Sequence, residues 1–370
     1  MSESFSQAYA RLKDFIGTHP EVEIGESVIS IPEDVRARFY AEFNAARGAF
    51  VEEKFPALLD RAGLLQENYR RAEENLAGLL SWEDSPMMAP VQRFLRGFKE
   101  SMERELFDPL FDMLKGRESI ESFEQKGSEA IATLWPAVFR GGYEKWATLT
   151  LLKLLEPEKA LRVNIRPLSP GERAKSPAYA PTAEIPAPEE SRSFLFSQPR
   201  NAILSVPDLI VRSAPLQRFV GIRSEFTQGM YNAFSASPER EWFPVTTDLL
   251  VVLESGLTLL YLSNRAEEIA LISDVTKFCR PDMVLWCIDA QAIARQEALE
   301  RMRIVNSKLN PLKGCFAIAT DAWQGEGAEL GLKGDEQSPR VQVLSAGFDE
   351  SRLKIVVDAL RDEKAPAALT

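Results

Sequence analysis

Histidine and cysteine are scarce in this 370-residue sequence, which has one His and three Cys. A single histidine, His19, excludes most His-based zinc sites and argues against a His-dependent catalytic triad. Cys279, Cys287 and Cys315 form no CxxC pair and lie in or beside apolar runs, as expected for buried free thiols in a reducing cytoplasm. The sequence therefore predicts no metal site, no cofactor and no catalytic role for His19.

Basic charge and long apolar runs are also lacking. The net charge is −11 and the pI is about 5.0, whereas broad nucleic-acid binding and docking on anionic lipid both need a basic surface. No apolar run approaches the ~20 residues needed to span a bilayer, and the N-terminal MSESFSQAYARLKDF lacks the apolar core of a signal peptide. We therefore expect a cytoplasmic protein with no transmembrane segment and no nucleic-acid partner.

Residues 1–165 have the pattern of a helical bundle. The clearest segment is SIPEDVRARFYAEFNAARGAF, in which Ser30 and Glu33 have capping-box spacing. Apolar residues then recur on one helical face, which predicts a buried stripe of Val35, Phe39, Phe43, Ala46 and Phe50. Pro56 is expected to interrupt this helix, and Gly116 is expected to end a later one.

Residues 166–193 are predicted to form a linker, because six prolines prevent regular helix and central strand. The segment should be extended and partly polyproline II, and should act as a semi-rigid spacer. A Pro-rich docking peptide is the alternative interpretation. The spacer is favoured because no PxxP motif in this segment is flanked by a strong basic cluster.

Residues 194–370 contain short apolar runs rich in Val, Leu and Ile, most of them separated by helical segments. The runs are 217–222, 248–253, 257–263, 282–289, 314–320 and 340–346. Continuous apolar strands that alternate with helices predict a mostly parallel sheet covered on both faces. Residues 248–263 are the exception and have the pattern of a hairpin. The predicted fold is therefore multidomain, with an all-α helical bundle followed by a three-layer α/β domain.

The segment RFVGIRSEFTQGMYNAF, residues 218–234, has the shape of a phosphate loop followed by a helix. Gly221 stands where the motif GxxxxGK[ST] begins. Phe226, Thr227 and Gln228 occupy the places of its second Gly, its Lys and its Ser or Thr. In such loops the backbone N–H groups, the Lys and the hydroxyl hold the phosphates and Mg²⁺. On this pattern, residues 217–361 resemble the P-loop GTPase domain of the translation-factor and dynamin-like class.

Two further positions fit the resemblance only in part. Thr246 and Thr247 lie in a PVTT segment similar to the one that carries the family's magnesium-contacting Thr. The family's third strand ends in DxxG, and here Ser263 and Ala266 replace the Asp and the Gly. The resemblance therefore implies a magnesium and γ-phosphate site that has lost its organising residues.

Of the last two motifs of the GTPase family, the sequence lacks the first and contains the second. Thr320 and Asp321 stand where the guanine-reading motif NKxD should begin, and the motif is absent. Ser345 and Ala346 match the serine-alanine pair that ends the family's last strand. Taken together, the resemblance implies a P-loop GTPase-like scaffold with a vestigial nucleotide site.

Loss of the nucleotide motifs with retention of the scaffold predicts a non-catalytic pseudo-GTPase that acts as a regulatory or protein–protein interaction module. The resemblance implies a protein partner, which could be an active GTPase, a second copy of the chain or another subunit of a complex. A degenerate nuclease-like or other metal-dependent hydrolase is one alternative, with Asp248, Asp282, Asp289 and Asp321 as its candidate carboxylates. An unconventional nucleotide-binding protein is the other alternative, with the ligand near Gly221, Thr246 and Ser345.

Overall fold

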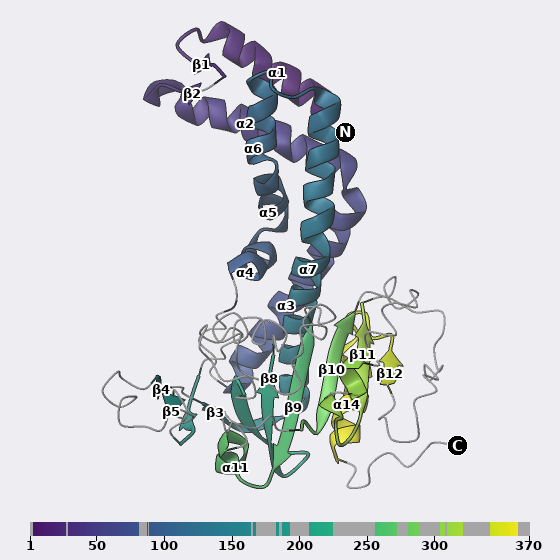
Figure 1. Ribbon diagram of the computed structural model, residues 1–370. Helices are drawn as coiled ribbons and strands as arrows, with labels where there is room; N and C mark the ends of the chain where they lie inside the picture. Colours follow the sequence, from purple (N-terminus) through teal and green to yellow (C-terminus); the bar gives the residue numbers. More distant parts are fainter. Residues whose placement is uncertain are drawn as a thin grey trace, which may run out of the picture. The chain divides into compact units, whose positions relative to one another are not determined.

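The computed structural model describes most of the first 163 residues and several segments of the remainder (Figure 1). The described residues are 3–26, 29–80, 87, 89–163, 166–167, 183–184, 187–192, 207–224, 256–271, 280–288, 304–307, 309–320 and 341–361. The chain divides into two units. The helical unit comprises Met1–Glu67 and Ala89–Phe139, and the sheet unit comprises Asn68–Met88 and Arg140–Thr370.

The helical unit confirms that the first part of the chain is helical. It contains α1 (Phe5–Thr18), α2 (Glu33–Lys54), α4 (Ala89–Arg96), α5 (Phe98–Glu105), α6 (Phe107–Leu114), a two-stranded antiparallel sheet of β1 (Glu23–Ile24) and β2 (Ile29–Ser30), and the first parts of α3 (Pro56–Leu80) and α7 (Ile120–Leu154). Within the described ranges, no helix combines the length and the apolar content needed to cross a membrane.

Pro56 and Gly116 mark helix boundaries as predicted, whereas one predicted helix cap is wrong. Pro56 begins α3 directly after the C-cap of α2, as expected for a residue without an N–H group. Gly116 follows the C-cap of α6 with φ +72°, a conformation that glycine adopts without steric cost. The predicted capping box of Ser30 and Glu33 is wrong, because Ser30 lies in β2 and Pro32 is the N-cap of α2.

The predicted stripe on α2 is confirmed. All five of its residues are buried, and Phe39, Phe43 and Phe50 have no exposed surface. Phe50 packs on Phe5 of α1 and Phe123 of α7, with ring centroids 5.4 and 5.1 Å away. Such aromatic contacts add to the stabilisation from burial of the rings. The core of the helical unit is therefore built largely from aromatic side chains of α1, α2, α6 and α7.

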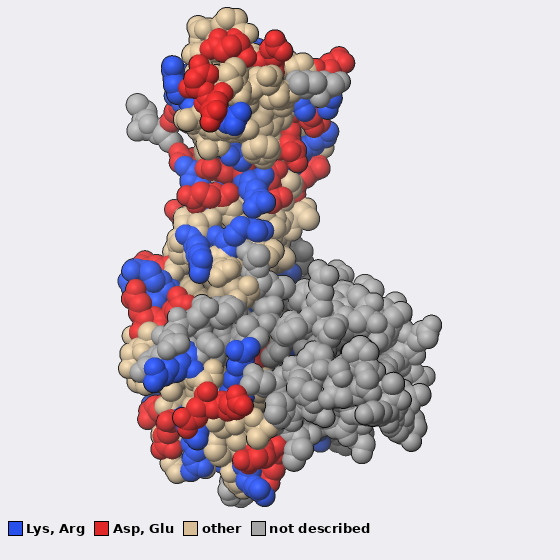
Figure 2. All heavy atoms as spheres, turned by 90° about the vertical axis from the view of Figure 1, so that its left-hand side faces the viewer, with Lys and Arg blue, Asp and Glu red and all other residues tan. Residues whose placement is uncertain are grey.

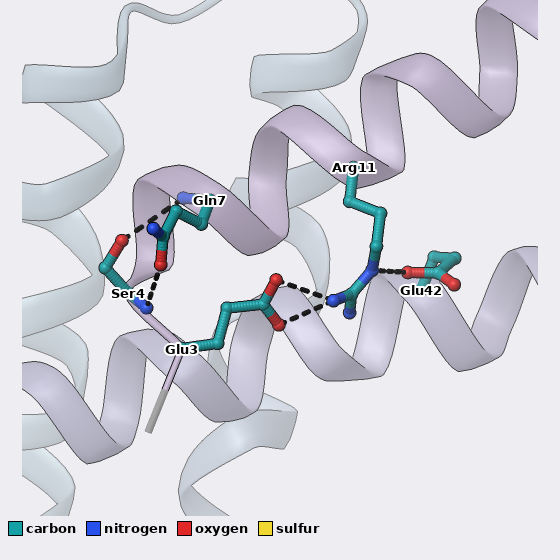
Figure 3. A network of polar contacts seen from close by, with 5 residues as sticks. All are labelled: Glu3, Ser4, Gln7, Arg11 and Glu42. Atoms are coloured by element: carbon teal, nitrogen blue, oxygen red, sulfur yellow. Dashed lines mark hydrogen bonds and ion pairs between the residues drawn. The ribbon is translucent and has the colours of Figure 1, made fainter. Parts of the chain in front are cut away.

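A polar network fixes the start of α1 against α2 (Figure 3). Ser4 and Gln7 form a capping box, in which each side chain accepts a hydrogen bond from the other residue's backbone N–H. Arg11 donates Nη1 to both carboxylate oxygens of Glu3, at 2.6 and 2.7 Å, and Nε to Glu42 of α2, at 2.5 Å. Because the Arg11 side chain is 46% exposed, each ion pair contributes at most about 1 kcal/mol.

The sheet unit contains an eight-stranded sheet in the order β12-β11-β10-β9-β8-β7-β3-β6. These strands are β3 (Pro157–Arg162), β6 (Glu189–Glu190), β7 (Leu209–Ser213), β8 (Arg218–Arg223), β9 (Leu257–Ser263), β10 (Met283–Ile288), β11 (Cys315–Ala319) and β12 (Val341–Leu344). The unit also contains α11 (Ala266–Leu271), α14 (Glu350–Arg361) and a small antiparallel pair of β4 (Arg166–Pro167) and β5 (Ala183–Glu184).

The prediction of a mostly parallel, P-loop GTPase-like sheet is wrong. Only the β10–β11 and β11–β12 pairs are parallel, and the other five pairs of the eight-stranded sheet are antiparallel. β8, the expected phosphate-loop strand, lies between β7 and β9 and is antiparallel to both. Strands β7 and β10 are buried almost throughout. A continuous apolar run therefore correctly predicts a strand that is covered on both faces, but it does not tell whether the strand is parallel or antiparallel to its neighbours. The expected strand at 248–253 lies outside the described residues.

The second part of α7 packs on the sheet. Residues 141–152 are all buried, so this stretch has no solvated face. The Tyr143 hydroxyl lies within hydrogen-bond distance of the carbonyl oxygens of Ala319 and Gly347, at 3.0 and 2.6 Å. Tyr143 and Trp146 also pack on Phe348, with ring centroids 5.5 and 5.1 Å away. These contacts place α7 against the ends of β11 and β12.

Candidate functional site

An open groove of about 750 Å³ lies in the helical unit. Its walls are two helices, α2 and α6, and the segment around β2. The lining residues are Ile29, Ile31, Arg36, Tyr40, Phe107, Asp108, Phe111, Asp112 and Lys115. The volume is within the range of ordinary ligand-binding clefts, roughly 300–1,000 Å³. We call this feature the α2–α6 groove.

Helical spacing explains why side chains of α2 and α6 face the groove together. Arg36 and Tyr40 are four residues apart on α2 and therefore lie on the same face, one turn apart. Phe107, Phe111 and Lys115 follow the same spacing along α6 and its C-cap. Each helix therefore buries one stripe in the core and turns the adjacent stripe toward the groove.

Aromatic rings form the floor of the α2–α6 groove. Phe111 and Phe43 are buried and their ring centroids are 4.4 Å apart. Phe107 lies 5.0 Å from Phe111 and 5.4 Å from Phe43, and Tyr40 stacks on Phe107 at 6.5 Å. Tyr40 and Phe107 are only half-buried, so part of each ring faces solvent. The groove therefore presents some aromatic surface among charged side chains, and a fully packed layer beneath holds the rings in place.

A cation stabilises the same aromatic layer. The Arg47 guanidinium lies over the rings of Phe43 and Phe107, 5.1 and 5.3 Å from their centroids. Arg47 Nη1 also donates to the carbonyl oxygen of Glu103, at 2.8 Å. Cation–π contacts of this kind contribute about 0.5–1 kcal/mol at partly exposed sites. Arg47 thus fixes the position of Phe107 relative to α2.

The charged residues of the groove differ in how they are paired. Asp112 lies 3.9 Å from the Lys115 ammonium and 3.4 Å from the Arg117 guanidinium. Arg36 Nη2 donates to the carbonyl oxygen of Ile31, at 3.2 Å, and so joins α2 to the β2 wall. Asp108 is exposed in the first turn of α6 and makes no hydrogen bond or ion pair with another described residue. Asp108 is therefore the carboxylate of this groove that is available to a partner.

A second set of polar groups is buried in the sheet unit. Asp208, at the start of β7, accepts from Arg223 Nη1 at 2.6 Å and from the backbone N and Oγ of Ser224 at 2.7 and 2.8 Å. The Asp208 and Arg223 side chains are 0% and 2% exposed. This arrangement neutralises both charges and ties the start of β7 to the end of β8.

A third polar group lies between α7 and the sheet. The Glu144 carboxylate accepts from Thr258 Oγ1 at 2.8 Å and lies 3.6 Å from the Lys145 ammonium. Burial is the main cause that raises the pKa of the nearby Cys287 thiol well above its ordinary value, and the Glu144 carboxylate raises it further. Burial likewise raises the pKa of Cys315 to about 12. Both thiols therefore stay protonated at neutral pH, as is typical of inert structural cysteines.

Gly221 lies in the middle of β8 rather than in a phosphate loop. It pairs with Ile210 of β7 and Tyr261 of β9. A Cβ atom at this position would lie 2.5 Å from Cγ2 of Ile269 in α11. The absence of a side chain therefore allows α11 to approach the sheet closely, which is a packing reason for the glycine.

The other predicted nucleotide-site residues are only partly brought together. Thr320 follows β11, and Ser345 and Ala346 follow β12, so these three lie at the same edge of the sheet. Ser263 ends β9 and its hydroxyl donates to Glu268, while Ala266 begins α11. β8 is separated from β11 by two strands, so Gly221 is roughly 14 Å from the β11 strand. Phe226, Thr227, Gln228, Thr246, Thr247 and Asp321 lie outside the described residues.

Of the four carboxylates considered for a metal site, only Asp282 is described. Asp282 Oδ2 accepts from the backbone N of Leu262 at 2.6 Å. Burial is the main cause that raises the pKa of Asp282 above its ordinary value. Asp248, Asp289 and Asp321 lie outside the described segments, and among the residues inside them no group of three or more His, Cys, Asp or Glu could hold a metal ion.

Sequence reasoning missed the α2–α6 groove. The predicted stripe of α2 is core at all five positions, so it gives no sign of the groove. The sequence feature that could have indicated the groove is Tyr40, an aromatic residue next to the buried Phe39. Arg36 lies one helical turn before it, and both side chains combine an apolar part with a polar end. Comparison of the chain with protein families, with curated proteins and with solved structures found no match.

Proposed function

We propose that this chain is a non-catalytic protein-interaction module that binds a segment of another protein in the α2–α6 groove. The observation that carries the proposal is the group of half-buried apolar side chains, Ile31, Tyr40 and Phe107, that faces one open groove. Aromatic residues over a packed floor are the usual anchors of protein interfaces. A partner would be another protein chain, and the proposal includes a regulatory role for the complex.

The energetics of the groove fit a weak, transient contact. Burial of a large apolar side chain contributes about 1.5–3 kcal/mol, so two or three anchors contribute about 3–9 kcal/mol. After a cost of association of at least about 4 kcal/mol, these anchors alone support binding no tighter than about 0.2 mM. Because Phe43, Phe111 and Arg47 already hold the floor in place, little ordering of the free protein is needed. A preorganised groove loses less entropy on binding than a flexible one.

The polar groups buried in the sheet unit support the non-catalytic part of the proposal. Asp208 is engaged by Arg223 and Ser224, and Glu144 is engaged by Thr258. Groups engaged in this way hold the fold together, whereas a catalytic group must reach a substrate. The free thiols of Cys287 and Cys315 support the proposed location in the cytoplasm, where thiols stay reduced.

Selection of a displayed library of random 16-residue peptides against the full-length chain tests the docking function. We expect enriched peptides to bind the wild-type chain and to lose at least tenfold in affinity on Ile31→Asp, because this change places a charge among the apolar anchors. Ile31 is half-buried and uses its backbone carbonyl to accept from Arg36, so the variant should keep its fold.

Leu64→Asp provides the matched control, because Leu64 is an apolar side chain of the helical unit that is 50% exposed and lies outside the groove. Binding should be unchanged on this variant. The proposal fails if no peptide is enriched, or if the enriched peptides bind Ile31→Asp as tightly as they bind the wild-type chain. Circular dichroism of both variants verifies that the helical unit is folded.

A further inference from the structure

The two helical walls of the α2–α6 groove run antiparallel. Arg47 of α2 donates to the carbonyl oxygen of Glu103, which precedes α6, whereas Phe39, about two turns earlier on α2, packs on Phe111 within α6. Residue numbers therefore rise along one wall as they fall along the other. Because antiparallel helices begin at opposite ends, the first turns of α2 and α6 lie toward opposite ends of the groove.

Each of these first turns carries one groove charge that no ion pair compensates within the described residues. Asp108, in the first turn of α6, is exposed and has no polar partner there. Arg36, in the first turn of α2, is exposed and donates only to the carbonyl oxygen of Ile31, which has no formal charge. Glu33 and Asp34 of the same turn do not line the groove. The Arg36 guanidinium is therefore available to a carboxylate of a partner.

The remaining charges of the groove reinforce its positive end. Asp112 lies 3.9 Å from the Lys115 ammonium and 3.4 Å from the Arg117 guanidinium, so two cations share one carboxylate. Both cations follow the last residue of α6 and so lie beside the first turn of α2. The groove is therefore positive toward Arg36 and negative toward Asp108.

Tyr40 supplies apolar contact between the two charged ends. It lies one turn after Arg36 on α2, and its ring stacks on Phe107, the neighbour of Asp108. On the face drawn in Figure 2, acidic and basic side chains are interspersed, so no broad surface of one sign competes with this local order. Exposed charges farther away than about 8 Å are largely screened at physiological salt, so the charges at the groove ends decide which segment fits.

We propose that the α2–α6 groove binds a segment of another protein with opposite charges at its two ends and apolar side chains between them. A basic side chain pairs with Asp108, an acidic side chain pairs with Arg36, and the apolar side chains contact Tyr40 and Ile31. This inference rests on the docking function proposed above and specifies the chemistry of its partner. Charge complementarity of this kind sets the orientation of a segment, because the reversed order brings like charges together at both ends.

Four synthetic peptides test the proposal by fluorescence anisotropy with the full-length chain. They share one central sequence of Leu, Ala and Gln and differ only at their ends, which carry Lys then Glu, Glu then Lys, Lys at both or Glu at both. We expect one of the two mixed peptides to bind at least threefold more tightly than the other, and more tightly than both uniform peptides. Equal affinities of the mixed peptides, or tightest binding by a uniform peptide, would overturn the proposal.

A chain with inverted groove charges locates the contact. Arg36→Glu combined with Asp108→Lys keeps the net charge and exchanges the signs of the two ends, and both side chains are exposed, so the fold should persist. We expect this variant to prefer the mixed peptide that the wild-type chain disfavours. Lys13→Glu combined with Asp14→Lys makes the same exchange on the exposed surface of α1, outside the groove, and should leave the wild-type preference in place.

The outcomes separate this inference from the docking function. If random selection returns peptides that depend on Ile31 but the charge-inverted chain keeps the wild-type preference, the docking function stands and the charge order is wrong. Sedimentation of the chain alone gives the remaining outcome. A dimer that is lost on Ile31→Asp and kept on Leu64→Asp would identify a second copy of the chain as the occupant, and would also overturn this inference.

Discussion

Asp208→Ala is expected to lower the free energy of unfolding of the sheet unit by about 3–5 kcal/mol. The substitution removes the carboxylate that accepts from Arg223 and Ser224. Arg223 is 2% exposed, so its charge would remain buried without compensation. An unpaired buried charge costs several kcal/mol, far more than the small net contribution of an intact pair.

Urea unfolding followed by circular dichroism measures this effect. Asp358→Ala is the matched control, because Asp358 pairs with Arg361 at 3.7 Å and both side chains are more than half exposed. The control should change stability by less than about 1 kcal/mol. Adding Arg223→Met to Asp208→Ala should recover part of the loss, since no charge is then left buried. A loss below about 1 kcal/mol for Asp208→Ala would contradict the structural role of this pair.

Phe43→Ala is expected to destabilise the helical unit by about 3–5 kcal/mol. The Phe43 ring has no exposed surface and contacts the rings of Phe39, Tyr40, Phe107 and Phe111. Truncation removes these contacts and leaves a cavity that a rigid aromatic layer cannot fill by relaxation. The same change removes support from beneath Tyr40 and Phe107, so peptide binding in the α2–α6 groove should weaken as well.

The stability of Phe43→Ala is measured by urea unfolding, with Leu64→Ala as the control. Leu64 is 50% exposed, so its truncation should cost less than about 1 kcal/mol. Phe43→Leu keeps most of the apolar volume and should fall between the two. Comparable losses for Phe43→Ala and Leu64→Ala would mean that the aromatic layer does not hold the helical unit together.

The sequence predicted the helical unit better than the sheet unit, for a physical reason. Phe39, Phe43 and Phe50 recur with helical spacing, and this local pattern is enough to identify the buried face of α2. Strand direction has no such local signal, because strands buried on both faces are continuously apolar in parallel and antiparallel sheets alike. The resemblance to a GTPase domain predicted parallel strands. The antiparallel pairing of β8 with β7 and β9 contradicts that prediction.

Gly221 shows how one residue type can suggest the wrong cause. In the sequence it stood at the start of a degenerate phosphate loop, whereas in the fold it gives space to Ile269. Both explanations use the missing Cβ atom, and only the position of α11 distinguishes them. The α2–α6 groove was beyond the sequence for a related reason. Its walls come from residues 29–40 and 107–115, and no local pattern shows that these segments meet.

Site-specific photo-cross-linking in the cells that make this protein tests the docking function most directly. p-Benzoylphenylalanine placed at Tyr40 keeps an aromatic side chain in the α2–α6 groove, and only its reaction with a molecule bound there gives a heavier product, because reaction within the chain leaves the mass unchanged. The same group at Leu64 lies on the helical unit outside the groove, at a side chain that is 50% exposed and therefore open to any chance encounter. We predict a discrete, heavier adduct from position 40 that is absent from position 64 and is lost on Ile31→Asp. No adduct at position 40, or the same adduct at both positions, would contradict the proposed function.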